Sequence, residues 1–252
     1  IADLPLKQRV EAMRKEEIKK KILSEDPIKG STFPLINRIG YSQMYRFGSP
    51  PNYNPKPEHS IDSLAKVGGI SSAELAYDVL LENEGNNFIY APLVNYADHT
   101  FGVCQKMLED KNAIMGLGDG GAHVGFILDA GYPTWLISYW SVKKKVFSME
   151  ETIRRLTSDT ALAAGLQDRG YLKVGLKADI NIIDWENVGS SDPFMIQDLP
   201  AGGKRLMQHT NGYVTTIVSG KITYQNGKST TERPGLLVRS VKDKKHTLEL
   251  AN

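Results

Sequence analysis

The chain has 252 residues, and its 31 Lys and Arg residues nearly balance its 29 Asp and Glu residues, which leaves a formal net charge of +2. Such a balance produces no large field of one sign, so neither a nucleic acid nor an anionic membrane surface is expected as a partner. The length suffices for one large domain or two smaller ones, each with its own apolar core.

No membrane span is predicted, because Asp129, Gly131 and Pro133 interrupt the longest apolar stretch, residues 124–140. A spanning helix needs about 20 continuous apolar residues. The single cysteine, Cys104, excludes a disulfide within the chain and suits a reducing compartment, so a cytoplasmic protein is expected. Apolar neighbours predict that this thiol is buried, and a nucleophilic cysteine is the alternative.

Up to residue 166, helical and strand-like patterns alternate along the chain. Ser71 or Ser72 is expected to cap one helix, and Ser148 with Glu151 has the spacing of a capping box. The alternation is typical of βα units around a parallel sheet and predicts an α/β fold. Periodicity and breakers predict helices over 6–24, 71–81, 98–109, 134–142, 149–155 and 157–166, and strands over 38–47, 87–91 and 113–115.

Beyond residue 166 the pattern changes to short strands and turns. Residues 170–184 predict two strands around a Val174-Gly175 turn, and residues 215–228 predict a hairpin in which Asn226-Gly227 indicates a type I′ turn at the following corner. The predicted organisation is therefore an α/β part over residues 1–165, a β part over 166–240 and a polar tail over 241–252.

Residues 116–123 read Gly-Leu-Gly-Asp-Gly-Gly-Ala-His and follow the predicted strand at 113–115 directly. An acid at the end of a strand, on a turn rich in glycine, is where α/β-barrel enzymes place a catalytic group. Asp119 is therefore the leading catalytic candidate. The alternative is a tight turn in which the Asp119 carboxylate only accepts hydrogen bonds from the backbone.

The same letters also fit the dinucleotide-binding pattern Gly-x-Gly-x-x-Gly. Two observations count against a nucleotide site. Asp119 would lie beside the phosphates and repel them, and Gly125, Gly131 and Pro133 interrupt the helix that the pattern requires. We therefore expect no nucleotide here, and tight binding of NAD or ATP would contradict this expectation.

Several motifs together resemble the amidohydrolase superfamily, and more narrowly the C-terminal half of the D-aminoacylases (N-acyl-D-amino-acid deacylases). The resemblance covers almost the whole chain, and its order and spacing are more specific than any single motif. The motifs are GLGDGGAHVG (116–125), LTSDTALAAGLQDRG (156–170), GLKADINIID (175–184), DLPAGGKRL (198–206), GYVTTIVSG (212–220) and RPGLLVR (233–239).

The resemblance implies the C-terminal part of a TIM-like (β/α)8 barrel followed by a small β-sandwich subdomain. Residues 87–91 and 113–117 would be the seventh and eighth barrel strands. Asp119 would be the general acid/base in a zinc-dependent hydrolysis of a small-molecule amide, such as an N-acyl (D-)amino acid. Asp119 is also a candidate metal ligand, and His123 is a candidate substrate-binding residue.

The sequence lacks the metal-binding histidines that the resemblance to this family implies. It has five histidines and no His-x-His, whereas a zinc site needs three or four converging ligands. We therefore expect one or two zinc ions whose ligands lie mostly outside this chain, on an N-terminal half that carries His-x-His, either covalently joined or as a separate chain. A non-catalytic half-chain that completes or scaffolds a separate metal-binding chain is the alternative.

A free half-barrel would expose strand edges, so we expect a partner, covalently joined or not. An oligomeric assembly is also expected. A second departure concerns the substrate. An N-acyl amino acid needs a cation for its carboxylate, yet the sequence from Asp119 to Trp140 contains no Lys or Arg. Tyr41, Ser42 and Arg46 are polar candidates elsewhere in the chain, with a purely structural role as the alternative.

Overall fold

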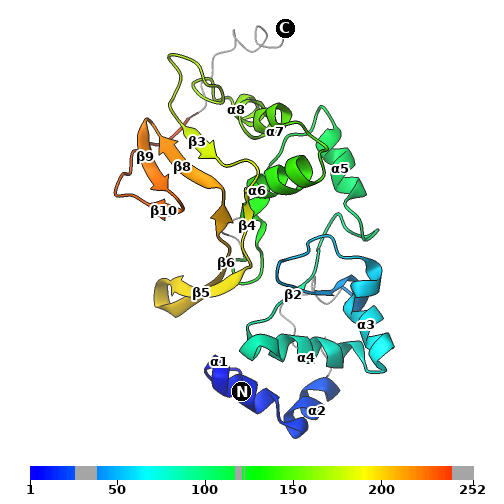
Figure 1. The fold of residues 1–252 in the computed structure, drawn as a ribbon. Helices are drawn as coiled ribbons and strands as arrows, with labels where there is room; N and C mark the ends of the chain where they lie inside the picture. The colour runs from blue at the N-terminus through cyan, green and yellow to red at the C-terminus, as the bar shows by residue number, and fades with distance from the viewer. Residues whose placement is uncertain (26–38, 117–120, 122, 240–252) are drawn as a thin grey trace. The chain divides into compact units, whose positions relative to one another are not determined.

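The computed structural model describes residues 1–25, 39–116, 121 and 123–239. The chain forms two compact units, Ile1–Glu109 and Asp110–Asn252, drawn in Figure 1. Helices and strands are mixed, as the sequence predicts. The described α-helices all precede residue 164 and the strands of the second unit all follow residue 179, which agrees with the predicted change near 166. The three-part domain division itself stays a prediction.

The N-terminal helix is divided into α1 (Leu6–Met13) and α2 (Glu16–Ser24), where the sequence predicted one continuous helix. Lys15 is extended at the junction (φ −74°, ψ 130°). The Tyr77 hydroxyl donates to the Met13 carbonyl at 2.8 Å, so a tertiary hydrogen bond satisfies an oxygen that a continuous helix would have bonded internally. Amphipathic periodicity cannot reveal such a contact.

The central helices of the first unit are α3 (Ile61–Gly68) and α4 (Ser72–Gly85). The predicted cap of α4 is confirmed, since the Ser71 hydroxyl accepts from the Glu74 amide at 3.1 Å. The predicted end is also confirmed, because Glu82 leaves helical geometry (φ −64°, ψ 161°). Ile61, Ala76 and Val79 form a buried cluster with Met44, Leu75 and Ile89 packed against it.

The strands of this unit are shorter than predicted. β1 (Tyr45–Arg46) and β2 (Ile89–Tyr90) pair antiparallel, with Tyr45 opposite Tyr90. The other described elements of this unit are η2 (Tyr41–Gln43), η3 (Pro57–His59) and α5 (Gly102–Glu109). α5 begins four residues later than the sequence predicted.

In the second unit, the predicted strand at 113–115 is wrong. Residues 113–116 belong to no strand, the Ala113 amide donates to the Asp110 carbonyl at 3.1 Å in a turn, and Ile114 is 54% exposed. A strand requires a neighbour to satisfy its backbone groups, and no neighbouring strand is found for these residues in the described part of the chain. A short apolar run alone does not define a strand.

The helices predicted for this unit are confirmed. The predicted helix over 134–142 is a short α-helix that continues as a π-helix, and its inner face is buried at Leu136, Ile137 and Trp140. The unit contains η4 (Asp129–Gly131), α6 (Tyr132–Trp135), the π-helix η5 (Leu136–Lys143), α7 (Met149–Leu156) and α8 (Ser158–Ala163).

The N-cap of α7 offers a direct test of the fold. The Ser148 hydroxyl accepts from the Glu151 amide at 3.1 Å, so Ser148→Ala should lower the free energy of unfolding by about 1 kcal/mol. Urea unfolding followed by tryptophan fluorescence measures this loss, because all three tryptophans lie in this unit. Ser148→Asp, which keeps a capping oxygen, should remain within about 0.5 kcal/mol of the parent; an equal loss in both variants would contradict the capping role.

A four-stranded antiparallel sheet in the order β10-β9-β8-β3 dominates the second unit, as Figure 1 shows. The predicted hairpin and its corner are confirmed, since Asn226 (φ 49°) and Gly227 (φ 76°) have the positive φ angles of a type I′ turn. The strands are β3 (Ile180–Ile183), β8 (Tyr213–Val218), β9 (Lys221–Gln225) and β10 (Lys228–Ser229).

The first of the two strands predicted within 170–184 is not formed. Only the turn at Val174-Gly175 is present, with Gly175 at φ 92°, and Leu172 and Val174 are 83% and 101% exposed. Apolar side chains with no neighbouring surface gain nothing from strand geometry. The second predicted strand is β3.

Two further antiparallel pairs complete the unit, β4 (Gly189–Ser190) with β7 (Thr210–Asn211), and β5 (Phe194–Leu199) with β6 (Gly203–Met207). The 3₁₀ turn η6 (Pro200–Gly202) connects β5 to β6. All strand pairs in the described residues are antiparallel and none closes a barrel, so the parallel pairing expected from the βα pattern is not found there.

Across the described residues, no helix has both the length and the apolar character needed to cross a membrane.

Candidate functional site

The leading catalytic candidate, Asp119, lies outside the described residues. Of the residues that follow it in the chain, Gly121 and residues 123–239 are described, and they belong to the second unit. His123 is exposed and has a left-handed backbone (φ 49°). Its carbonyl accepts from the amides of Phe126 at 3.0 Å and Ile127 at 3.1 Å, so a compact turn fixes the backbone at His123.

The His123 ring stacks on Phe126, with ring centroids 5.4 Å apart and planes inclined by 29°. This packing restricts the orientation of the imidazole while the residue remains exposed to solvent. An oriented, accessible imidazole can donate or accept a hydrogen bond, which is what a substrate-binding role requires. The role predicted for His123 stays a prediction.

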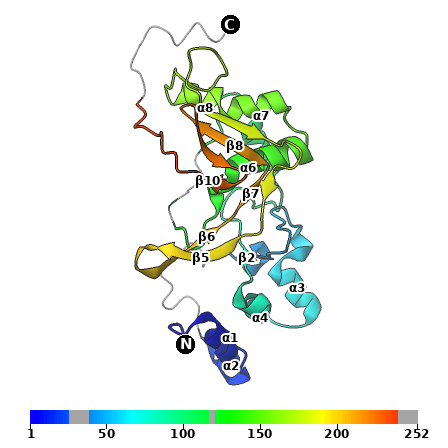
Figure 2. The ribbon, with the colours of Figure 1, turned by 60° about the vertical axis from the view of Figure 1, so that its left-hand side comes forward.

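The hairpin β5–β6, visible in Figure 2, lies beside this turn. The Leu206 amide on β6 donates to the Val124 carbonyl at 2.7 Å. Further along, a methyl group placed on Gly131 would lie 3.6 Å from the side-chain oxygen of Gln208. Two contacts therefore align residues 124–131 with residues 206–208, in the same direction.

β6 carries two adjacent cations with different surroundings. Arg205 reaches Asp198 with a double hydrogen bond of 2.7 and 2.6 Å, and this contact lowers the pKa of Asp198 and raises the pKa of Arg205. Lys204 is exposed and has no ion-pair or hydrogen-bond partner in the described part of the chain. The sequence motif over 198–206 contained this lysine, but nothing local connected it to the His123 turn.

The polar candidates for carboxylate binding lie in the first unit. Tyr41 and Ser42 are exposed on η2. Arg46 on β1 forms an ion pair with Glu82 at 2.5 Å. The guanidinium group therefore already binds a carboxylate of the same chain. The structure therefore gives Arg46 a structural role and does not bring it together with Tyr41 and Ser42 in a described contact.

An aromatic cluster surrounds β1 and β2 in the first unit. Tyr45 is 1% exposed, and its hydroxyl shares a 2.5 Å hydrogen bond with Nδ1 of His99. Burial raises the pKa of Tyr45. His99 precedes α5, is not helical, and packs with its ring against Tyr45 and Tyr96. The neighbouring rings in the cluster are Phe47, Tyr53, Phe88, Tyr90, Tyr96 and Phe101.

Cys104, on α5, is half-buried, and its thiol donates to the Asn95 carbonyl at 3.5 Å. Burial raises the pKa of this thiol. Because the thiolate is the nucleophilic form, a raised pKa disfavours catalysis by Cys104. The packing interpretation of this cysteine is supported over the nucleophilic one.

The described residues do not provide a metal site. No group of three or more His, Cys, Asp or Glu side chains in that part of the chain could hold a metal ion. A zinc site requires three or four converging ligands. The metal-binding side chains of the described residues therefore do not fit the zinc centre that the family resemblance implies. Asp119 is not among the described residues.

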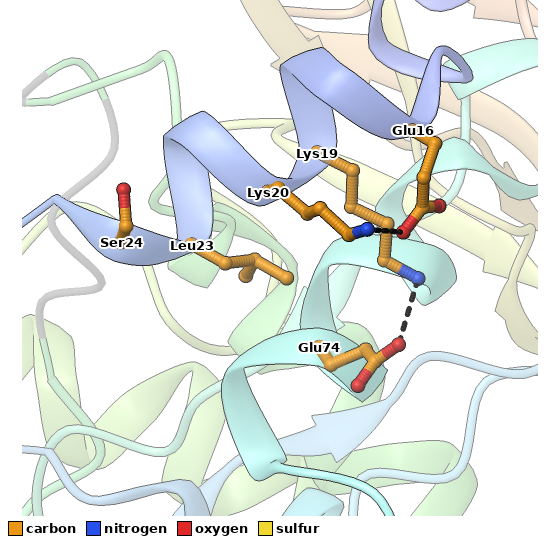
Figure 3. A pocket seen from close by; sticks show the side chains of 6 residues that line it. All are labelled: Glu16, Lys19, Lys20, Leu23, Ser24 and Glu74. Atoms are coloured by element: carbon orange, nitrogen blue, oxygen red, sulfur yellow. Dashed lines mark ion pairs between the residues drawn. The ribbon is translucent and has the colours of Figure 1, made fainter.

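An open pocket of about 340 Å³ lies between α2 and α4, shown in Figure 3. Its cations are paired: Lys19 contacts Glu74 at 3.1 Å and Asp78 at 2.9 Å, and Lys20 lies 3.6 Å from Glu16. Hydrogen bonding to Asp78 is the main reason that the pKa of Lys19 is raised. The Lys19 pairs link α2 to α4, whereas the Lys20–Glu16 pair lies within α2. The pocket therefore presents no unbalanced charge for a ligand.

Comparison with known proteins identifies the family. Residues 37–224 match the model of the amidohydrolase family, which is more than half of the chain, and the chain belongs to this family. It is 35% identical to a dihydroorotase of Lactobacillus acidophilus over 89 residues, 34% of this chain and 20% of that protein. It is 37% identical to a 5′-deoxyadenosine deaminase of Methanobrevibacter smithii over 90 residues, 31% of this chain and 20% of that protein.

The matched stretches thus span about a fifth of the length of these curated relatives. No solved structure matches the chain. Membership of the amidohydrolase family confirms the broader resemblance predicted from the sequence. The named relatives are a dihydroorotase and a deaminase, so the narrower resemblance to the D-aminoacylases is not shown.

Proposed function

We propose that this chain is the C-terminal part of a metal-dependent amidohydrolase that hydrolyses the C–N bond of a small-molecule amide, such as an N-acyl (D-)amino acid. The observation that carries the proposal is the family match over residues 37–224, which includes the whole glycine-rich loop. A deaminase among the relatives is consistent with cleavage of a C–N bond. The motifs quoted above favour the D-aminoacylase group within the family.

In this proposal Asp119 is the general acid/base. Its carboxylate takes a proton from the water that attacks the amide carbonyl and returns that proton to the departing amine. His123, exposed and oriented by Phe126, donates a hydrogen bond to the substrate. The oxygen atoms of an amide and an acyl group are suitable acceptors for an imidazole N–H.

The rest of the enzyme would be an N-terminal half that carries His-x-His, joined covalently or present as a separate chain. That half would supply most of the ligands for one or two zinc ions and the remaining strands of a TIM-like barrel and β-sandwich. The assembly is proposed to be oligomeric and cytoplasmic, and the single half-buried thiol suits a reducing compartment.

A second candidate function is a non-catalytic half-chain that scaffolds a separate metal-binding chain. The observation that favours it is the lack, in the described residues, of any group of three metal-binding side chains. The two candidates differ in one respect: only the first assigns a chemical step to a residue of this chain.

Native mass spectrometry of the purified protein, with the denatured mass measured in parallel, tests the shared assembly. We expect a species heavier than the 27.9 kDa of this sequence, with additional mass increments of the size of a zinc ion. A chelator should remove these increments and should also abolish the amide hydrolysis activity. A metal-free protein of 27.9 kDa that hydrolyses no amide would contradict the proposal.

A further inference from the structure

The strand β6, which carries Lys204, is hydrogen-bonded to the turn that carries His123. Leu206 bonds to Val124, and Gln208 lies beside Gly131, so residue numbers increase in the same direction along both segments. Moving back along β6 from Leu206 therefore leads away from Gly131 and towards the His123 end of the turn. Lys204, two residues before Leu206, lies on that side.

The distance is suitable for a contact with a ligand at His123. Two residues of a β-strand span about 6.6 Å, and an extended lysine side chain reaches about as far from its backbone. Lys204 and Leu206 also share one face of β6, because side chains alternate along a strand. The ammonium group of Lys204 can thus reach a small molecule bound beside His123.

Of the two cations on β6, Lys204 is the one for which the described residues provide no partner. Arg205 points from the opposite face and is held by Asp198 in a double hydrogen bond. Residues 119–140 contain no Lys or Arg. Lys204 is exposed and has neither an ion pair nor a hydrogen bond within the described residues.

We propose that Lys204 binds the carboxylate of the substrate, so that the preferred substrates are amides that carry a free carboxylate group. This inference rests on the proposed amide hydrolysis. Lys204 is a specificity residue: a flexible ammonium group gives a charge-assisted hydrogen bond to a carboxylate and takes no part in the proton transfer assigned to Asp119. Residues 119–140 contain no Lys or Arg to bind a substrate carboxylate, and Lys204 on β6 would take this role.

The test compares wild type and Lys204→Met in the complete enzyme. The substrates are N-acetyl amino acids and the matching N-alkylacetamides, in which hydrogen replaces the carboxylate. For the N-acetyl amino acids, Lys204→Met should raise KM about 10- to 100-fold with kcat nearly unchanged, because a charge-assisted bond present throughout the reaction is lost. Turnover of the N-alkylacetamides should not change, and Lys204→Arg should restore part of the affinity.

Lys228→Met is the matched control, because Lys228 is an exposed lysine on β10 of the same unit. It should leave both substrate classes unaffected, and equal melting temperatures would show that the variants fold alike. If Lys204→Met changes the KM of both substrate classes equally, or of neither, Lys204 does not bind the substrate carboxylate. The proposed amide hydrolysis would be unaffected by that result. If wild type hydrolyses none of the amides, the proposed function itself has failed.

Discussion

Replacing Asp119 with Asn in the complete enzyme should reduce kcat about 10²- to 10⁴-fold, the usual contribution of a positioned general acid/base. The amide of Asn has nearly the shape of the carboxylate but cannot take a proton from water. Folding should be unaffected, so the melting temperature should match that of wild type. Steady-state hydrolysis of N-acetyl amino acids measures the loss.

Asp110→Asn provides the control for this prediction. Asp110 precedes the same glycine-rich loop, and its carboxylate accepts from the Asn112 amide at 2.8 Å, a bond that the oxygen of Asn can also accept. Its turnover should stay close to that of wild type. Turnover of the Asp119→Asn enzyme within twofold of wild type would exclude the acid/base role and favour the scaffolding half-chain.

The sequence predicted those parts of the fold that depend on local chemistry. Ser71 and Ser148 cap their helices because a hydroxyl reaches an amide three residues ahead. Asn226-Gly227 turns the chain because both residues tolerate positive φ angles. None of these features requires knowledge of distant parts of the chain, so a single sequence is sufficient to predict them.

The failed predictions involve partners that are distant in the sequence. The helix over 6–24 divides where Tyr77 bonds to Met13, and the run at 113–115 is not a strand because it has no described neighbour. The site shows the same limit. Asp119 and His123 stand out in a short motif, whereas Lys204 enters the argument only through the Leu206–Val124 hydrogen bond.

At Gly212, between β7 and β8, the packing of the second unit leaves no room for a side chain. Its backbone has φ 82°, and its carbonyl accepts from the Asp184 amide at 2.7 Å between β7 and β8. A methyl group there would lie 2.6 Å from Val188 Cα and 3.0 Å from the Asp184 carbonyl oxygen. Those atoms belong to the backbone, so no side-chain rotation can relieve the overlap.

Gly212→Ala should therefore lower the free energy of unfolding by about 3 kcal/mol or more, the sum of a left-handed backbone cost of about 1 kcal/mol and an overpacking cost of about 2 kcal/mol. Gly220→Ala isolates the first cost, because Gly220 has φ 76° and no atom within 4 Å of the added methyl group. Urea unfolding followed by tryptophan fluorescence measures both variants. Equal losses would mean that Val188 and Asp184 move aside freely, and the close packing of this junction would then contribute nothing to the stability of the unit.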